Sequence, residues 1–229
     1  MSRKRELVLV VDVETADMIE NPKVYDLGYA VVERSTGNVI EEHSLVISDI
    51  FYGQSDLMQS AYYAEKLPQY DIGIVNGDWK VVKAWTAWRM VKDIMKKYNI
   101  TRVYAYNCAF DRRALNGTMR FVSGGTCRNF FPRGTKFCDI WHMACTTILR
   151  QKRYRKFAEA NGLVSPFGNL RTSAEAAYAY MTNTPEYAEP HTGLADVHIE
   201  IAIMMHVLRQ KKKITEAIVP NPWRLAQVA

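Results

Sequence analysis

The segment Leu7–Thr15 reads LVLVVDVET and decides the fold, because five apolar residues run without a break into two acids. A short continuous apolar run is typical of a strand that is buried on both faces. Residues two apart in a strand point to the same face, so Asp12 and Glu14 project together. Two carboxylates at a buried strand end repel each other, and bound divalent cations would resolve that conflict. The alternative is an exposed strand end that carries two solvated acids.

Working outward, the sequence predicts two more strands at residues 26–33 and 39–48, which the turn Thr36-Gly37-Asn38 joins as an antiparallel hairpin. A fourth buried strand is predicted at residues 103–106. Helices are predicted at residues 56–65, 80–98, 109–119, 140–154, 173–181 and 195–211. Strands first, then strands interleaved with helices, indicate an α/β protein with a mixed sheet covered by helices. No linker rich in proline, glycine or serine divides the chain, so we expect a single domain over residues 1–229.

The charge of the chain is unevenly distributed. The net charge is +6, and residues 112–156 carry eleven Lys or Arg but a single acid, Asp139. A basic segment beside an acidic remainder indicates a polyanion-binding surface around a separate carboxylate centre, whereas the alternative is a solvated helical face. Aromatic residues interleaved in this segment could stack on bases or belong to the core, among them Phe121, Phe130, Phe131 and Tyr154.

The first residues are too polar for a secretory signal, and no apolar run approaches the length of a membrane span. We therefore expect a cytoplasmic protein that has no membrane partner.

Two further polar segments follow predicted strands or precede predicted helices. Asn107-Cys108-Ala109-Phe110-Asp111 would bring Asp111 to the sheet edge that holds Asp12, although a helix cap is the better explanation of this segment taken alone. In His191-Thr192-Gly193-Leu194-Ala195-Asp196, Gly193 would let the backbone bend so that His191 folds back toward Asp196. A histidine near metal-bound water can accept its proton, since its pKa lies close to neutrality. The position of Asp196 near a helix N-terminus is a sufficient structural explanation for that acid.

Taken together, the three motifs resemble those of the DEDDh exonucleases, the family that contains RNase T and the proofreading subunits of bacterial polymerases. That family has D-x-E on its first strand, N-x-x-x-D at a strand-to-helix junction and H-x-x-x-x-D before its last helix. The resemblance implies an RNase H-like fold, with a five-stranded mixed β-sheet flanked by helices, and catalysis with two divalent cations, Mg²⁺ or Mn²⁺. It also implies that the metal ligands are Asp12, Glu14, Asp111 and Asp196, and that His191 is the general base.

The activity that the resemblance implies is that of a 3′–5′ exonuclease, which hydrolyses phosphodiester bonds at the ends of single-stranded DNA or RNA. The substrate-binding residues that we expect are Thr15, Asn107, Arg153 and Arg155. Residues 49–79 depart from the pattern of well-known family members, and residues 121–136 resemble an insertion, so DNA and RNA both remain open as substrates. Two alternatives also remain: a catalytically weak nucleic-acid-binding or regulatory protein that retains the fold, and an endonuclease with the same metal centre.

Overall fold

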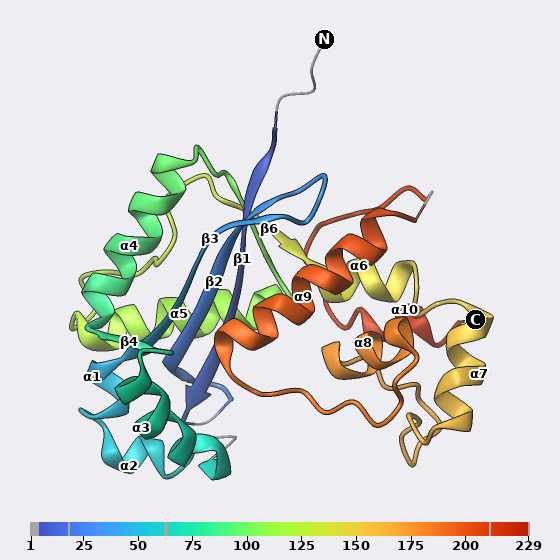
Figure 1. The fold of residues 1–229 in the computed structure, drawn as a ribbon, viewed down its shortest axis with the longest axis horizontal. Helices are drawn as coiled ribbons and strands as arrows, with labels where there is room; N and C mark the ends of the chain where they lie inside the picture. Colours follow the sequence, from blue (N-terminus) through green and yellow to red (C-terminus); the bar gives the residue numbers. More distant parts are fainter. Residues whose placement is uncertain (1–4, 18, 62–63, 211, 229) are drawn as a thin grey trace.

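A six-stranded mixed sheet forms the centre of the computed structural model, which describes residues 5–17, 19–61, 64–210 and 212–228 (Figure 1). Its strands are β1 (Leu7–Ala16), β2 (Lys23–Glu33), β3 (Val39–Ile47), β4 (Lys80–Val82), β5 (Arg102–Ala105) and β6 (Lys136–Asp139). They lie in the spatial order β4-β3-β2-β1-β5-β6. β2 pairs antiparallel with both β1 and β3, while β1–β5, β3–β4 and β5–β6 are parallel pairs.

The α/β class and the mixed sheet are confirmed, but the sheet has six strands rather than five. Neither β4 nor β6 shows the apolar run by which the equally short β5 was predicted, because β4 has only three residues and β6 begins with the exposed Lys136. Residues 80–82, predicted as the start of a helix, pair instead with β3. The helix begins later, because the side chain of Asp49 accepts a hydrogen bond from the backbone N–H of Ala84 at 2.6 Å. This partner lies 35 residues away, so no local pattern reveals it.

The helices, in chain order, are α1 (Ser48–Phe51), α2 (Ser55–Met58), the 3₁₀ turn η1 (Ala64–Lys66), α3 (Leu67–Asn76), α4 (Ala84–Lys97), α5 (Cys108–Val122), α6 (Ile140–Thr146), α7 (Lys152–Ala160), α8 (Ala174–Thr182), α9 (Gly193–Leu208) and α10 (Trp223–Ala226). None of the helices in the described ranges is long and apolar enough to cross a membrane.

Three predicted helices need correction. The helix predicted at residues 140–154 is in fact two, α6 and α7, because the backbone leaves the helical conformation at Thr147. The helix predicted at residues 56–65 is replaced by α2 and η1, and residues 62–63 lie outside the described residues. The last long helix, α9, ends at Leu208, and residue 211 of its predicted range is likewise outside them.

Helices cover both faces of the sheet (Figure 1). Side chains along β1 alternate between two hydrophobic clusters: Leu9, Val11 and Val13 pack on the side of α4 and α5, while Val8 and Val10 pack on the side of α6 and α9. Asp12 and Glu14 lie on the same face of β1 as Val8 and Val10, because every second side chain of a strand points to the same face. The two acids therefore project toward the face that α9 covers.

Candidate active site

A pocket of about 470 Å³ lies where β1 and β5 end and where α5 and α9 begin. This volume is within the usual range for small-ligand sites. Seven of the nine site residues predicted from the sequence line the pocket: Asp12, Glu14, Thr15, Asn107, Asp111, His191 and Asp196. The structure thus brings together three motifs that are at least 80 residues apart in the sequence.

The two acids of β1 do not lie at a solvated strand end. Glu14 has only 7% of its surface exposed, so the alternative with two solvated acids is wrong. Burial is the main cause that raises the pKa of Glu14 to about 10, followed by repulsion from Asp12 and Asp196. Burial also raises the pKa of Asp12 well above its ordinary value, and Glu189 adds to the shift. Glu14 therefore holds a proton at neutral pH unless a cation replaces it.

Asp111 enters the pocket from the first turn of α5. The junction between β5 and α5, which precedes Asp111, is held by the side chain of another acid, Asp139. Asn107 takes a left-handed conformation, with φ at 69°, and its side chain makes no cap hydrogen bond. Instead Asp139 accepts hydrogen bonds from the backbone N–H groups of Asn107 and Cys108, at 3.1 and 3.4 Å. Asp111 is buried, and its Oδ2 has no hydrogen-bond partner among the described residues. A helix cap therefore explains neither Asn107 nor Asp111.

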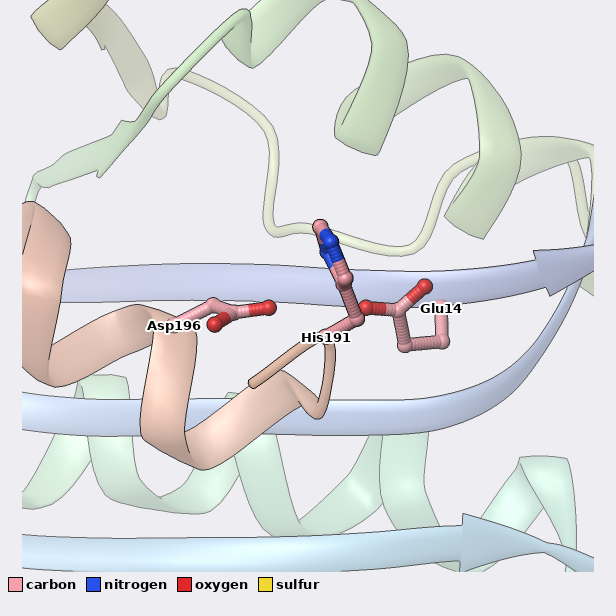
Figure 2. A group of neighbouring side chains, drawn as sticks. All are labelled: Glu14, His191 and Asp196. Atoms are coloured by element: carbon pink, nitrogen blue, oxygen red, sulfur yellow. The ribbon is translucent and has the colours of Figure 1, made fainter. Parts of the chain in front are cut away.

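The histidine loop, residues 189–193, brings His191 beside Glu14 and Asp196. Ligand atoms of these three side chains all lie within 4.8 Å of one another, and Figure 2 shows the imidazole between the two carboxylates. The bend that the sequence assigned to Gly193 occurs at His191 itself, whose φ is 57°. Burial, followed by the charge of Lys66, lowers the pKa of His191, so its imidazole is neutral at pH 7.

Asp196 lies in the first turn of α9, as predicted from the sequence, and only 4% of its surface is exposed. Burial is the main cause that raises its pKa to about 9, followed by repulsion from Asp12. Its Oδ1 has no hydrogen-bond partner among the described residues, so the helix N-terminus does not satisfy this carboxylate. A buried acceptor without a donor is costly for the fold, which favours a ligand-binding role.

Gly193 has a different role, which is to let α9 begin in contact with β2. A Cβ placed on Gly193 would lie 2.5 Å from the backbone N of Gly28, and a Cβ on Gly28 would lie 2.1 Å from the carbonyl carbon of Gly193. Gly28 is the cross-strand partner of Asp12. Two glycines therefore set the separation between the strand pair that carries the acids and the helix that carries Asp196.

Asp26 fixes the same contact with hydrogen bonds. Its Oδ2 accepts from the backbone N–H of Gly193 at 2.9 Å, from the Tyr70 hydroxyl at 2.7 Å and from the Trp79 indole at 3.3 Å. Tyr70 lies on α3, and Trp79 follows that helix, so residues 49–79 supply two of the three donors. This segment thus connects directly to the base of the histidine loop.

Among the pocket residues that sequence reasoning missed, several carry a polar or titratable group that could serve the site, including Tyr106, Trp141, Glu189 and Glu200. Glu200 was detectable, since it follows Asp196 by four residues and the two share a helix face. Gly28 also carried a signal, because a glycine inside a strand often marks a close backbone approach.

Arg153 and Arg155 lie on α7 and are not among the residues that line the pocket. Arg153 is exposed, whereas the guanidinium of Arg155 donates a hydrogen bond to the carbonyl oxygen of Gln227 at 2.8 Å. Their role in substrate binding stays a prediction. Of the aromatic residues that were considered for base stacking, Phe130, Phe131 and Tyr154 are buried in the core, whereas Phe121 is exposed, at 46% of its surface.

The donor set of the pocket fits hard divalent cations. Four carboxylates, from β1, α5 and α9, supply only oxygen ligands, which Mg²⁺ and Mn²⁺ prefer. Two of these acids, Asp111 and Asp196, keep a buried oxygen without a hydrogen-bond partner among the described residues. A bound cation would satisfy such oxygens and remove the repulsion between the carboxylates.

Comparison with known proteins finds matches in structure only. No protein-family model and no curated protein sequence matches this chain. Among solved structures, the nuclease domain of 3′hExo, a DEDDh family member bound to rAMP, matches with a TM-score of 0.56 and 13% identity, over 95% of this chain and all of that one. A 3′-exonuclease structure that shows 3′-end specific recognition of a histone mRNA stem-loop matches with a TM-score of 0.57 and 13% identity, over 95% of this chain and 69% of that one.

A zinc-bound E. coli ExoI–ssDNA complex matches with a TM-score of 0.53 and 15% identity, over 91% of this chain. The present chain spans only 42% of the length of that protein. The matched enzymes therefore differ in length and in the nucleic acid that they hold, while they share one architecture. The protein has the RNase H-like α/β fold of the DEDDh 3′–5′ exonucleases.

Proposed function

We propose that the protein is a metal-dependent 3′–5′ exonuclease that removes nucleotides from the ends of single-stranded DNA or RNA by a two-metal mechanism. One observation carries the proposal: the four acids and the histidine expected from the sequence meet in one pocket of a DEDDh-type fold. The matched structures support a 3′-end substrate, because they are complexes with single-stranded DNA, with rAMP and with a histone mRNA stem-loop that is recognised at its 3′ end. We also propose that residues 1–229 act as one exonuclease domain, since both hydrophobic clusters pack on the same sheet.

The chemistry divides between the acids and the histidine. Two divalent cations held by Asp12, Glu14, Asp111 and Asp196 would supply activation of the attacking water and neutralisation of the charge on the leaving 3′ oxygen. His191 accepts a proton from that water at a ring nitrogen, which its lowered pKa leaves free of a proton at neutral pH. The water oxygen bonds to phosphorus as the bond between phosphorus and the 3′ oxygen breaks. That 3′ oxygen takes up a proton from solvent and becomes the new 3′ hydroxyl of the strand, and a nucleoside 5′-monophosphate leaves. The rAMP of the matched DEDDh domain is a product of this kind.

Substrate contacts are assigned to two regions. Thr15 and Asn107 line the pocket beside the acids, and we propose that they contact the terminal nucleotide. The basic segment divides between two faces of the molecule, because α5 packs into one hydrophobic cluster and α7 into the other. We propose that Arg153 on α7 contacts phosphates of the strand outside the pocket.

The direct test uses end-labelled single-stranded DNA, single-stranded RNA and duplex, each with Mg²⁺, Mn²⁺ or EDTA, resolved at single-nucleotide spacing. We expect a 3′-labelled strand to release labelled mononucleotide first, and EDTA to abolish the reaction. The variant Glu41→Gln is a matched control, because Glu41 pairs with Lys97 on the far edge of β3 and does not line the pocket. It should cleave as the wild type does.

Three results would argue against the proposal. Full activity in EDTA would remove the two-metal mechanism. Early internal cuts in a circular strand would indicate an endonuclease, and tight binding in Mn²⁺ without cleavage would indicate a regulatory protein.

Arg153→Glu tests the α7 contact. It should weaken strand binding and flatten the salt dependence of that binding, since fewer counterions are released. Arg153 suits this test better than Arg155, whose bond to Gln227 would be lost as well. Arg209→Glu makes the same charge change at the end of α9, outside the basic segment, and should have a smaller effect. If strand binding by the two variants depends on salt concentration with the same slope, the basic segment is only a solvated face.

A further inference from the structure

The pocket contains a further buried acid, Glu200, that the DEDDh motifs do not include. Glu200 lies one helical turn after Asp196 on α9, and only 2% of its surface is exposed. It lines the same pocket as Asp12 and Asp111. An acid is almost never buried to this extent unless a partner compensates its charge.

The two oxygens of Glu200 have different surroundings. Oε1 accepts a hydrogen bond from the backbone N–H of Tyr106 at 2.8 Å, at the junction between β5 and α5. Oε2 is buried and has no hydrogen-bond partner among the described residues. One oxygen thus fixes the direction of the carboxylate, while the other, in a residue that lines the pocket, has no donor among the described residues.

The surroundings of Glu200 do not compensate its charge. Burial is the main cause that raises the pKa of Glu200 well above its ordinary value, and repulsion from Asp12 and Asp111, which carry the same sign of charge, adds to the shift. Within the part of the chain that the structure describes, no Lys or Arg lines the pocket. In the ion-pair contacts of the described residues, Glu200 has no cationic partner. A structural role would require only the Tyr106 hydrogen bond, which a neutral amide could accept equally well.

We infer that Glu200 is a fifth carboxylate ligand of the divalent-cation centre, with Oε2 as the ligand atom. The inference rests on the proposed function, because it requires that Asp12 and Asp111 hold a cation. It adds a residue to the centre of this chain that the three sequence motifs do not contain. Its consequence is a higher affinity for cations before any nucleic acid is bound, since five carboxylates exceed the charge of two divalent ions.

The experiment is a titration of the protein with Mn²⁺ alone, in which electron paramagnetic resonance of the free ion gives the number of bound ions and their Kd. Glu200→Gln keeps an oxygen that accepts from Tyr106 and removes the charge. We expect its Kd for at least one Mn²⁺ to rise by about 10–100-fold, the usual scale for groups that support a metal site. Without metal, its Tm should equal or exceed that of the wild type, because a buried acid has been replaced by a neutral group.

Asp139→Asn is the matched control. Asp139 is equally buried and accepts backbone N–H groups at the same junction, but it does not line the pocket. Its Mn²⁺ affinity should stay within about threefold of the wild type. Glu200→Ala is measured in parallel, so that a folding defect of the amide variant does not prevent the comparison, and it should lose Mn²⁺ affinity to the same extent.

The outcomes separate the inference from the proposed function. Wild-type Mn²⁺ affinity in a folded Glu200→Gln or Glu200→Ala overturns the inference and leaves the four-acid centre intact. An equal loss of affinity in Asp139→Asn also overturns it, because the effect then comes from the β5–α5 junction. Absence of Mn²⁺ binding by the wild type refutes the metal centre itself, and the inference with it.

Discussion

The contact between Gly28 and Gly193 allows a prediction whose magnitude follows from the structure. In Gly28→Ala, the new Cβ would lie 2.1 Å from the carbonyl carbon of Gly193 and 2.2 Å from the backbone N of Leu194. Ordinary contacts begin near 3.4 Å, so β2 and the start of α9 must separate by about 1.3 Å. The opposing atoms are backbone atoms and cannot rotate away. Added volume at such a site costs about 1–3 kcal/mol, which for a chain of this size lowers the Tm by roughly 2–12 °C.

The displacement also reaches the site, because Gly193 begins the helix that carries Asp196 and follows the loop that carries His191. A misplacement of about 1 Å can reduce a rate by roughly a hundredfold. We therefore expect kcat to fall by at least that factor, although Gly28 does not line the pocket. Thermal melts and single-turnover cleavage of a 3′-labelled strand would measure the two effects.

Gly117→Ala is the matched control for this prediction. Gly117 lies inside α5, and the nearest atom to its new Cβ is the carbonyl oxygen of Pro22 at an ordinary 3.5 Å. Alanine in a helix interior is better than glycine by about 1 kcal/mol, so Tm should be unchanged or higher and turnover unchanged. A wild-type Tm and turnover in Gly28→Ala would refute the reasoning. Loss of stability alone, with full turnover, would show that the position of the histidine loop does not depend on this contact.

Three other predictions concern the acids and the histidine. In Asp12→Asn, cleavage should be lost and Mg²⁺ should raise the Tm much less than in the wild type, which gains about 2.7 kcal/mol at a hundredfold excess over Kd; equal shifts would show that Asp12 is not a ligand. In His191→Ala, kcat should fall by about 10²–10⁴ with little change in Mn²⁺ affinity, and wild-type turnover would assign the residue to structure. In EDTA, the free energy of unfolding should fall as pH rises from about 4 to 9, because the raised pKa values of Glu14 and Asp196 keep protons on the folded protein that the unfolded chain has released. Thermal melts from pH 5 to 9 should show a smaller decline in Tm with Mg²⁺ than with EDTA. A Tm in EDTA that does not change with pH would contradict the raised pKa values of Glu14 and Asp196.

The sequence predicted the centre of the fold because the relevant signals are local. The apolar run of β1 continues directly into Asp12 and Glu14, and α5 and α9 follow short polar segments that mark helix starts. Each of these patterns needs only a few neighbouring residues. The joint occurrence of three motifs in order then indicated that their acids meet at one sheet edge.

The features that were missed depend on partners far apart in the chain. The start of α4 is fixed by Asp49 and the junction before Asp111 by Asp139, and neither contact leaves a local pattern. Edge strands β4 and β6 are short and begin with exposed residues, so they lack the apolar run of a buried strand. Tertiary contacts, rather than intrinsic propensity, decide these boundaries.

The hydrogen bonds of Asp26 have a consequence for the motions of the site. One oxygen of this buried carboxylate accepts from the amide of Gly193, from Tyr70 and from the Trp79 indole, so the histidine loop and the segment after α3 share an anchor. Neither segment can open without exposing a buried acceptor that the other also needs. The Gly193 amide and the Trp79 indole should then exchange their hydrogens with solvent in one cooperative opening rather than independently. The histidine loop would in that case take its rigidity from a helix that lies outside the three motifs.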